Sequence, residues 1–256
     1  MRLRYLVILA IAIAAAAFYV GVNLGVREFK EVDELGEWHE VIVAGPYVVI
    51  KHDPGAHQRD FNTAMKYIEA RRASWERRKK LLDKYGDEAY KAYVVPCKIY
   101  TFEEFSTLAK SLGLTDKIVE VVTYVYYKNG TYALLGHGVR LEGYSFDKWL
   151  ESIKEKAFIS TALILTGEPP LNVTEAVEVG RSVAEVYVGA FVVEAPLKEL
   201  YALSKKPEIL MVDTPLDLIW KYRKEGKTVV VKRVAHGDRY LIEKKNLCQS
   251  RDRSID

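Results

Sequence analysis

Hydrophobic and polar positions change their period several times along the chain, and the first segment differs most from the rest. Tyr5 to Val26 contains no charged side chain over 22 residues. A helix of that length spans roughly 33 Å, which matches a bilayer hydrocarbon core of about 30 Å. Residues 27–38 are acidic and poor in apolar side chains, so they predict a juxtamembrane stalk or short helix. Val41 to Ile50 is β-branched and broken by Gly45-Pro46, which indicates a bent strand or hairpin.

A helical period extends from His57 to Tyr85 and predicts one long amphipathic helix that ends at Gly86. Its apolar residues recur at spacings of three, four or seven and form one stripe: Phe61, Met65, Ile68, Trp75 and Leu82. The opposite face is predicted to be basic: Arg71, Arg72, Arg77, Arg78, Lys79 and Lys80. A solvated helix face explains such a cluster, and a docking patch for anionic lipid or an acidic partner is the alternative.

The next part of the chain, residues 91–167, alternates strand and helix signals. A capping box at Thr101–Glu104 begins one helix, and Gly113 ends it. Asn129-Gly130 fits a tight hairpin turn, and Ser145 begins a second helix. The strands are predicted over 92–100, 117–127, 132–135 and 158–165. This βαββαβ order is typical of a ferredoxin-like α/β sandwich.

A second α/β stretch follows the break at Gly167–Pro170, with strands over 184–194, 208–212 and 228–234 and helices that begin near Pro196 and Thr214. The predicted fold class is α+β: an N-terminal transmembrane helix followed by ferredoxin-like sandwich regions with a mixed or antiparallel sheet. The predicted segments are a signal anchor over 1–26, a stalk, short strands and the basic helix over 27–90, the ferredoxin-like unit over 91–167, a second α/β unit over 168–242 and a flexible tail over 243–256.

Charge on either side of the apolar run predicts its orientation. Arg2 and Arg4 precede the run, and residues 27–40 are acidic in balance. The basic bias places the N-terminus in the cytoplasm and the bulk of the chain outside the cell membrane. Two alternatives stay open: a signal peptide cleaved near Ala14–Ala17, with secretion of the rest, and a buried soluble helix.

Composition excludes several classes of function. The chain of 256 residues has 38 basic and 35 acidic side chains, a net charge of +3 that is too balanced to indicate a nucleic-acid partner. Two cysteines, Cys97 and Cys248, cannot build a disulfide framework or a four-thiolate zinc site. We expect Cys97 to be buried as a small hydrophobe, with a disulfide to Cys248 as the alternative. Serine-hydrolase, phosphate-loop and zinc-helix motifs are absent, and no cofactor is indicated.

Four polar residues around a Pro-Gly turn are weak candidates for metal ligands: His52, Asp53, His57 and Asp60. Imidazole and carboxylate groups suit a divalent metal, and a loop that leads into a helix can bring them together. Ordinary loop polarity with helix capping explains the same residues. An extracytoplasmic hydrolase or metal-dependent enzyme is therefore an alternative function, and whether the chain is an enzyme stays open.

Residues 183–213 resemble a known family. Phe191 to Leu200 and Pro207 to Asp213 are similar to the second half of subtilisin-type protease propeptides, which are ferredoxin-like domains that chaperone and inhibit their protease. The layout of an N-terminal span and an exterior α/β region resembles membrane-anchored sigma-factor regulators. Both resemblances imply a sandwich fold and a binding task, and neither transfers a catalytic residue. The sequence thus predicts a membrane-anchored exterior module that binds a protein or small ligand, with a protease-inhibitor-like role as an alternative.

If Tyr5–Val26 is a membrane anchor, we expect the full-length protein to sediment with membranes and to stay there in high salt. An apolar helix is retained by burial, which salt does not screen as it screens exposed charges. The measurement is the protein content of membrane and soluble fractions before and after a salt wash. A chain that lacks residues 5–26 is the control and should appear in the soluble fraction. Release of the full-length chain by salt would contradict the anchor.

Overall fold

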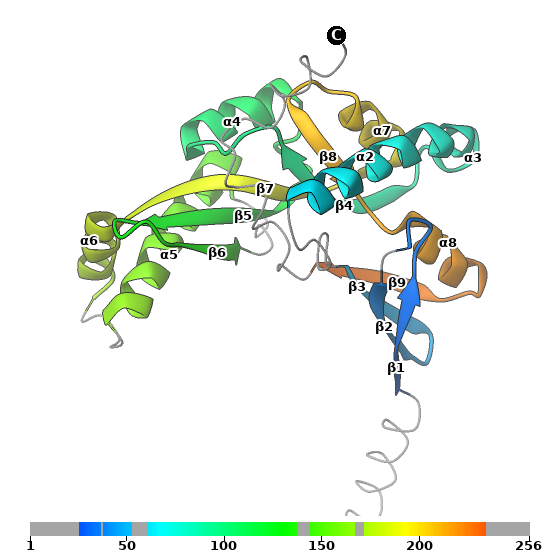
Figure 1. Cartoon of the computed structure of the whole chain (residues 1–256), viewed down its shortest axis with the longest axis horizontal. Helices are drawn as coiled ribbons and strands as arrows, with labels where there is room; N and C mark the ends of the chain where they lie inside the picture. Colours follow the sequence, from blue (N-terminus) through cyan, green and yellow to red (C-terminus); the bar gives the residue numbers. More distant parts are fainter. Residues whose placement is uncertain (1–25, 37, 53–60, 138–143, 167–171, 234–256) are drawn as a thin grey trace, which may run out of the picture. The chain divides into compact units, whose positions relative to one another are not determined.

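The computed structural model describes residues 26–36, 38–52, 61–137, 144–166 and 172–233 (Figure 1). The chain forms two compact units, and its described residues pass from unit 1 to unit 2 and back once. Unit 1 takes its described residues from 26–52 and 215–233, and unit 2 takes its described residues from 61–214. Strands and helices together form both units, so the predicted α+β class is confirmed.

Unit 1 contains a four-stranded mixed sheet in the order β1-β2-β3-β9. The first three strands are antiparallel neighbours, and β9 joins β3 in parallel, with Tyr47 opposite Thr228. Helix α8 precedes β9 in the chain and buries Leu218, Ile219 and Tyr222. The elements are β1 (Val26–Val32), β2 (Trp38–Ala44), β3 (Tyr47–His52), α8 (Leu216–Lys224) and β9 (Thr228–Arg233).

The predicted stalk over 27–38 is wrong, because these residues begin with strand β1. Each of its residues pairs with one of β2, from Val26 opposite Ala44 to Val32 opposite Trp38. The charged composition of this segment does not favour a strand by itself, and pairing with β2 overrides that local preference. The hairpin expected at Gly45-Pro46 is confirmed between β2 and β3.

Unit 2 contains a five-stranded antiparallel sheet in the order β6-β5-β7-β4-β8. The strands are β4 (Ala89–Pro96), β5 (Ile118–Tyr127), β6 (Tyr132–His137), β7 (Ala184–Pro196) and β8 (Ile209–Asp213). The helices are α2 (Phe61–Arg78), η1 (Lys79–Leu81), α3 (Leu82–Tyr85), α4 (Phe102–Ser111), α5 (Phe146–Thr166), α6 (Val173–Val183) and α7 (Leu197–Ser204).

The βαββαβ order is present as β4-α4-β5-β6-α5/α6-β7, but the sheet departs from ferredoxin-like strand order. Strand β7, the last of that series, lies between β5 and β4, where a ferredoxin-like sheet would place the third strand. Strands β7 and β8 also belong to this sheet, whereas β9 belongs to the sheet of unit 1. The stretch 168–242 therefore contributes strands to both sheets.

The strand predicted at Phe158–Leu165 is wrong, because these residues form the second half of helix α5. A short apolar run fits a buried strand or a buried helix equally well by its pattern. This half of α5 packs closely against α6: a Cβ at Gly180 would lie 2.1 Å from the Phe158 carbonyl oxygen. Only glycine allows that approach of the two helices.

The local start and stop signals in unit 2 are confirmed. Thr101 accepts a hydrogen bond from the Glu104 amide, and the Glu104 carboxylate accepts one from the Thr101 amide, as a capping box requires. Gly113 and Gly130 have positive φ angles of 66° and 83° at the end of α4 and in the β5–β6 turn.

None of the described helices has the length and apolarity needed to cross a bilayer. Of the run Tyr5–Val26, only Val26 lies within the described residues. The predicted tail over 243–256 and the break at Gly167–Pro170 also lie outside them.

Candidate functional site

Unit 1 contains a buried polar cluster of Asp33, His39 and His52. Nε2 of His39 lies 3.1 Å from Oδ2 of Asp33, and the Nδ1 atoms of the two histidines lie 3.4 Å apart. The two imidazole rings stack with centroids 5.1 Å apart. Oδ1 of Asp33 also accepts a hydrogen bond from the Leu35 amide at 2.8 Å, which fixes the carboxylate in a tight turn after β1.

The Asp33 carboxylate restricts the tautomer of His39. A carboxylate only accepts, so Nε2 of His39 carries the hydrogen, and in the neutral ring its Nδ1 is then an acceptor. In that tautomer, Nδ1 of His39 could accept a hydrogen bond only from a ring in which Nδ1 of His52 carries the hydrogen. Both histidines are only 2% exposed, so the cluster lies in the interior of unit 1.

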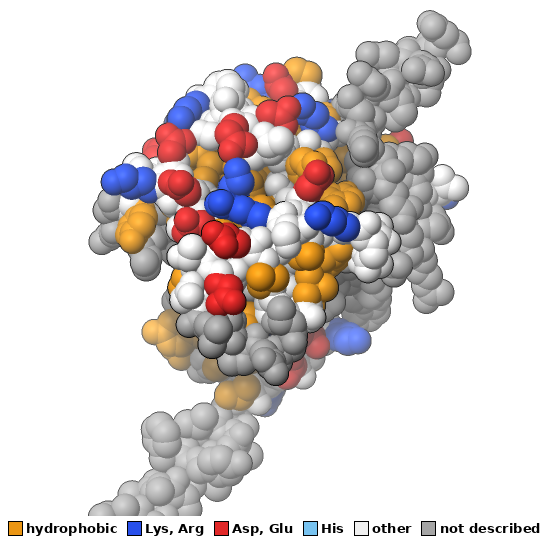
Figure 2. Space-filling view, turned by 90° about the vertical axis from the view of Figure 1, so that its left-hand side faces the viewer, with side chains coloured by type: hydrophobic (Ala, Val, Ile, Leu, Met, Phe, Trp, Pro, Cys, Tyr) orange, Lys and Arg blue, Asp and Glu red, His pale blue; other side chains and the backbone are white. Residues whose placement is uncertain are grey.

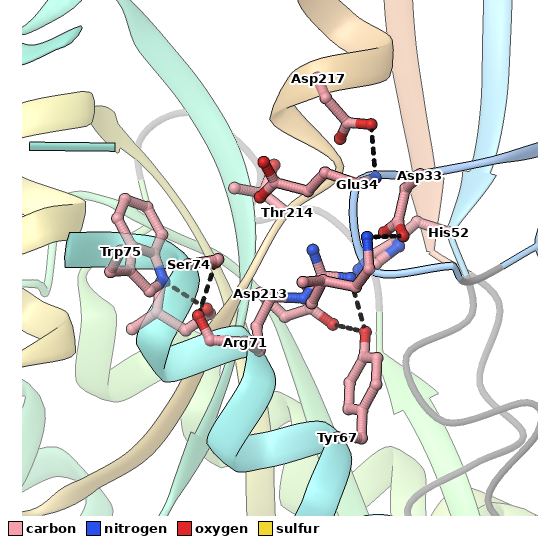
Figure 3. Close-up of polar contacts among 12 residues, drawn as sticks. Asp33, Glu34, His52, Tyr67, Arg71, Ser74, Trp75, Asp213, Thr214 and Asp217 are labelled. Atoms are coloured by element: carbon pink, nitrogen blue, oxygen red, sulfur yellow. Dashed lines mark hydrogen bonds and ion pairs between the residues drawn. The ribbon is translucent and has the colours of Figure 1, made fainter. Parts of the chain in front are cut away.

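Asp217 on α8 is a second unusual acid of unit 1. Oδ2 of Asp217 accepts a hydrogen bond from the Glu34 amide at 2.8 Å, as Figure 3 shows. Burial, and then the negative charges of Asp33 and Glu34, raise the pKa of Asp217. Burial and two neighbouring acids therefore oppose the ionised form of this carboxyl.

Unit 2 contains a fully buried ion pair between Arg71 of α2 and Asp213 of β8 (Figure 3). Nε of Arg71 lies 2.7 Å from Oδ1 of Asp213, and neither side chain is exposed. The Tyr67 hydroxyl donates to Oδ2 of Asp213 at 2.5 Å and accepts from Nη2 of Arg71 at 2.9 Å. Burial, and then the Asp213 charge, raise the pKa of Tyr67 well above its usual value, so its phenol stays protonated and donates.

Further side chains of α2 bind the same end of β8. The Trp75 indole donates to the Val212 carbonyl at 2.7 Å, and Arg78 donates to the Thr214 carbonyl at 3.1 Å. Tyr67, Arg71 and Trp75 are four residues apart and thus share one helix face. This face attaches α2 to the last residues of unit 2.

The predicted basic patch is therefore corrected in part. Arg71 and Arg78 are 0% and 2% exposed and belong to the buried face of α2. The residues left for a solvent-facing patch are Arg72, Arg77, Lys79 and Lys80. The prediction treated Arg71 and Arg78 as solvent-exposed. Their aliphatic stems can pack like apolar side chains, and their guanidinium groups bind the Asp213 carboxylate and the Thr214 carbonyl.

The accessible candidate for a binding site in unit 2 is a groove with a volume of about 410 Å³ among α4, α5 and α6. Figure 2, viewed from the side of these helices, shows acidic and basic side chains interspersed. The groove is lined by Phe102, Glu103, Ser106, Thr107, Lys110, Asp147, Leu150, Glu151, Lys154, Glu155 and Arg181.

Two ion pairs hold α4 to α5 along this groove. Lys110 binds Asp147 at 2.8 Å, and Lys154 binds Glu103 at 2.9 Å. The Lys110 ammonium, and then the Ser106 hydroxyl at 2.6 Å, lower the pKa of Asp147, so this carboxyl is ionised at neutral pH. Within each pair the opposite charges neutralise each other, and the two pairs connect α4 to α5.

Three charged side chains of the groove form no ion pair with any described residue: Glu151, Glu155 and Arg181. The two glutamates lie one turn apart on α5, and the arginine belongs to α6. The groove thus offers charges of both signs to a partner. No sequence motif marks this groove, because its lining comes from three separate helices.

Of the four candidate metal ligands, only His52 lies within the described residues; Asp53, His57 and Asp60 lie outside them. Nδ1 of His52 points to His39. Within the described residues, no group of three or more His, Cys, Asp or Glu side chains is arranged so that it could hold a metal ion, and this includes Asp33, His39 and His52. The sequence prediction missed His39 and Asp33, although the alternation in β2 places His39 on the same face as buried Val41.

Cys97 is buried, as expected, and it is disulfide-bonded. The alternative of an oxidised cysteine therefore holds for Cys97, while Cys248 lies outside the described residues. Within the segment that resembles protease propeptides, β8 has all five residues buried.

The Arg71–Asp213 pair generates a stability prediction. Arg71→Met leaves the Asp213 carboxylate buried without its counter-charge, and we expect the free energy of unfolding to fall by about 3–5 kcal/mol. The double variant Arg71→Met/Asp213→Leu should lose much less, because no buried charge remains. Urea unfolding measures both. Arg77→Met, a change at an exposed position of the same helix, is the control and should cost within about 0.5 kcal/mol. Equal losses for Arg71→Met and the control would refute the role of the pair.

The raised pKa of Asp217 generates a pH prediction. Since its folded pKa lies above the ordinary value of 3.8, ionisation opposes folding above the folded pKa, and this penalty vanishes below 3.8. Asp217→Asn keeps an oxygen for the Glu34 amide and removes the charge. We expect a higher thermal unfolding midpoint at pH 7 and a gain that shrinks as the pH falls towards 3.8. Glu225→Gln, at the exposed end of α8, is the control. A gain that stays constant with pH would contradict the electrostatic cause.

The chain matches no protein-family model, no curated protein and no solved structure.

Proposed function

We propose that the chain is a single-pass, membrane-anchored extracytoplasmic module with a binding or regulatory role. The observation that carries this proposal is the uncharged run Tyr5–Val26, whose last residue is the first residue of β1, where a folded α+β region begins. Basic residues before the run and acidic residues after it favour the orientation with a cytoplasmic N-terminus.

The disulfide at Cys97 supports an exterior location. Disulfides persist mainly in oxidising compartments, whereas the cytosol of most cells keeps thiols reduced. This support is independent of the apolar run, because it comes from a residue in the core of unit 2.

The groove among α4, α5 and α6 is the proposed binding surface. It is open to solvent, whereas the Asp33–His39–His52 cluster and the Arg71–Asp213 pair are buried. A groove with Glu151, Glu155 and Arg181 available suits a protein segment that carries charges of both signs better than a purely anionic ligand.

Protease treatment of intact cells tests the location. If the bulk of the chain is outside, added protease should remove it without lysis, and Cys97 should react with a maleimide only after reduction. A cytoplasmic protein in the same cells is the control for lysis. Full protection of the chain until the cells are lysed would show that the orientation is wrong.

A further inference from the structure

Strand β1 is an open sheet edge of seven residues. It ends the order β1-β2-β3-β9, so only its inner side pairs with a described strand. An antiparallel strand directs the N–H and C=O groups of alternate residues to either side, so the backbone groups on the outer side of β1 pair with no strand among the described residues. Val26, Phe29 and Val32 are 42%, 41% and 40% exposed along this edge. Long edges with apolar side chains are templates for pairing with another strand.

The sequence of β1, Val-Arg-Glu-Phe-Lys-Glu-Val, is complementary to itself in the antiparallel sense. When a second copy is placed opposite with the two Phe29 residues as the central pair, Glu28 faces the partner's Lys30 and Arg27 faces the partner's Glu31. Val26 faces the partner's Val32. All charged positions then meet the opposite charge, and the apolar positions meet apolar ones.

We propose that two copies of this chain pair through β1 about a two-fold axis at Phe29, and so join two four-stranded sheets into one of eight strands. Such an interface is isologous, because the same surface serves both copies. Backbone groups of alternate residues would form roughly six to eight hydrogen bonds across the axis. Opposite charges directly across a strand pair stabilise it, and like charges destabilise it.

Charges already present in the protomer fit this pairing. Arg27 and Lys30 form no ion pair with any described residue, so both are available to the partner. Glu28 binds Lys51 at 2.9 Å, and Glu31 binds Lys221 and the Tyr222 hydroxyl. A carboxylate has enough acceptor sites to serve a second cation. The two acids are therefore held in place by their own protomer while they face the partner.

Disulfide trapping in the full-length protein tests the register. Opposed antiparallel residues have Cα atoms about 4.5–5.5 Å apart, which a disulfide spans. Phe29→Cys should therefore give a cross-linked dimer under mild oxidation. Val26→Cys is the matched control: its exposure is similar, but it lies about 20 Å from its own copy in this register. We expect cross-linking of Phe29→Cys to be at least about tenfold faster. Equal rates for the two variants would overturn the proposal.

Charge variants test the complementarity. In the Phe29→Cys background, Lys30→Glu places Glu opposite Glu28, and Glu28→Lys places Lys opposite Lys30. Each variant alone should pair about tenfold more weakly, whereas an equimolar mixture should recover the cross-linking rate, because the two chains complement each other. Circular dichroism checks that both variants are folded. A mixture that cross-links no faster than the separate variants would overturn this register, whether the chain is monomeric or binds a different strand.

Discussion

The buried ion pair between Arg71 and Asp213 is the interaction on which the organisation of unit 2 depends. It is held in a triangle with the Tyr67 hydroxyl, so each member of the triangle binds the other two. Desolvating two charges is expensive, and the cost is offset only when geometry and hydrogen bonds are good. Because Asp213 ends β8, the triangle ties helix α2 to the point where the chain leaves unit 2.

The same reasoning separates structural polar groups from accessible ones. Asp33, His39 and His52 are hydrogen-bonded to one another in the interior of unit 1 and are closed to solvent. The groove has the opposite character, since its ion pairs are exposed and brace α4 against α5. Burial and hydrogen-bond geometry, rather than residue type, distinguish the two kinds of site.

The sequence predicts those parts of the fold that short-range chemistry controls. The capping box at Thr101, the stop at Gly113 and the turn at Gly130 each depend on a few adjacent residues, and all three are confirmed. The second half of α5 was missed because a short apolar run fits a helix or a strand, and strand β1 was missed because it depends on pairing with β2, which the local pattern does not reveal. The groove and the burial of Arg71 were missed for the same reason: their partners lie far away in the chain.

The parallel pairing of β3 with β9 has a consequence for biosynthesis. It places Tyr47 opposite Thr228, so the first three strands of unit 1 leave the ribosome before unit 2, and the fourth leaves after it. Loop closure over so long a separation is slow, and nascent domains fold as their residues emerge. Unit 2 can therefore complete its sheet first, while β3 keeps a temporary unpaired edge. Strand β9, the last described strand, then completes the sheet that β1, β2 and β3 began.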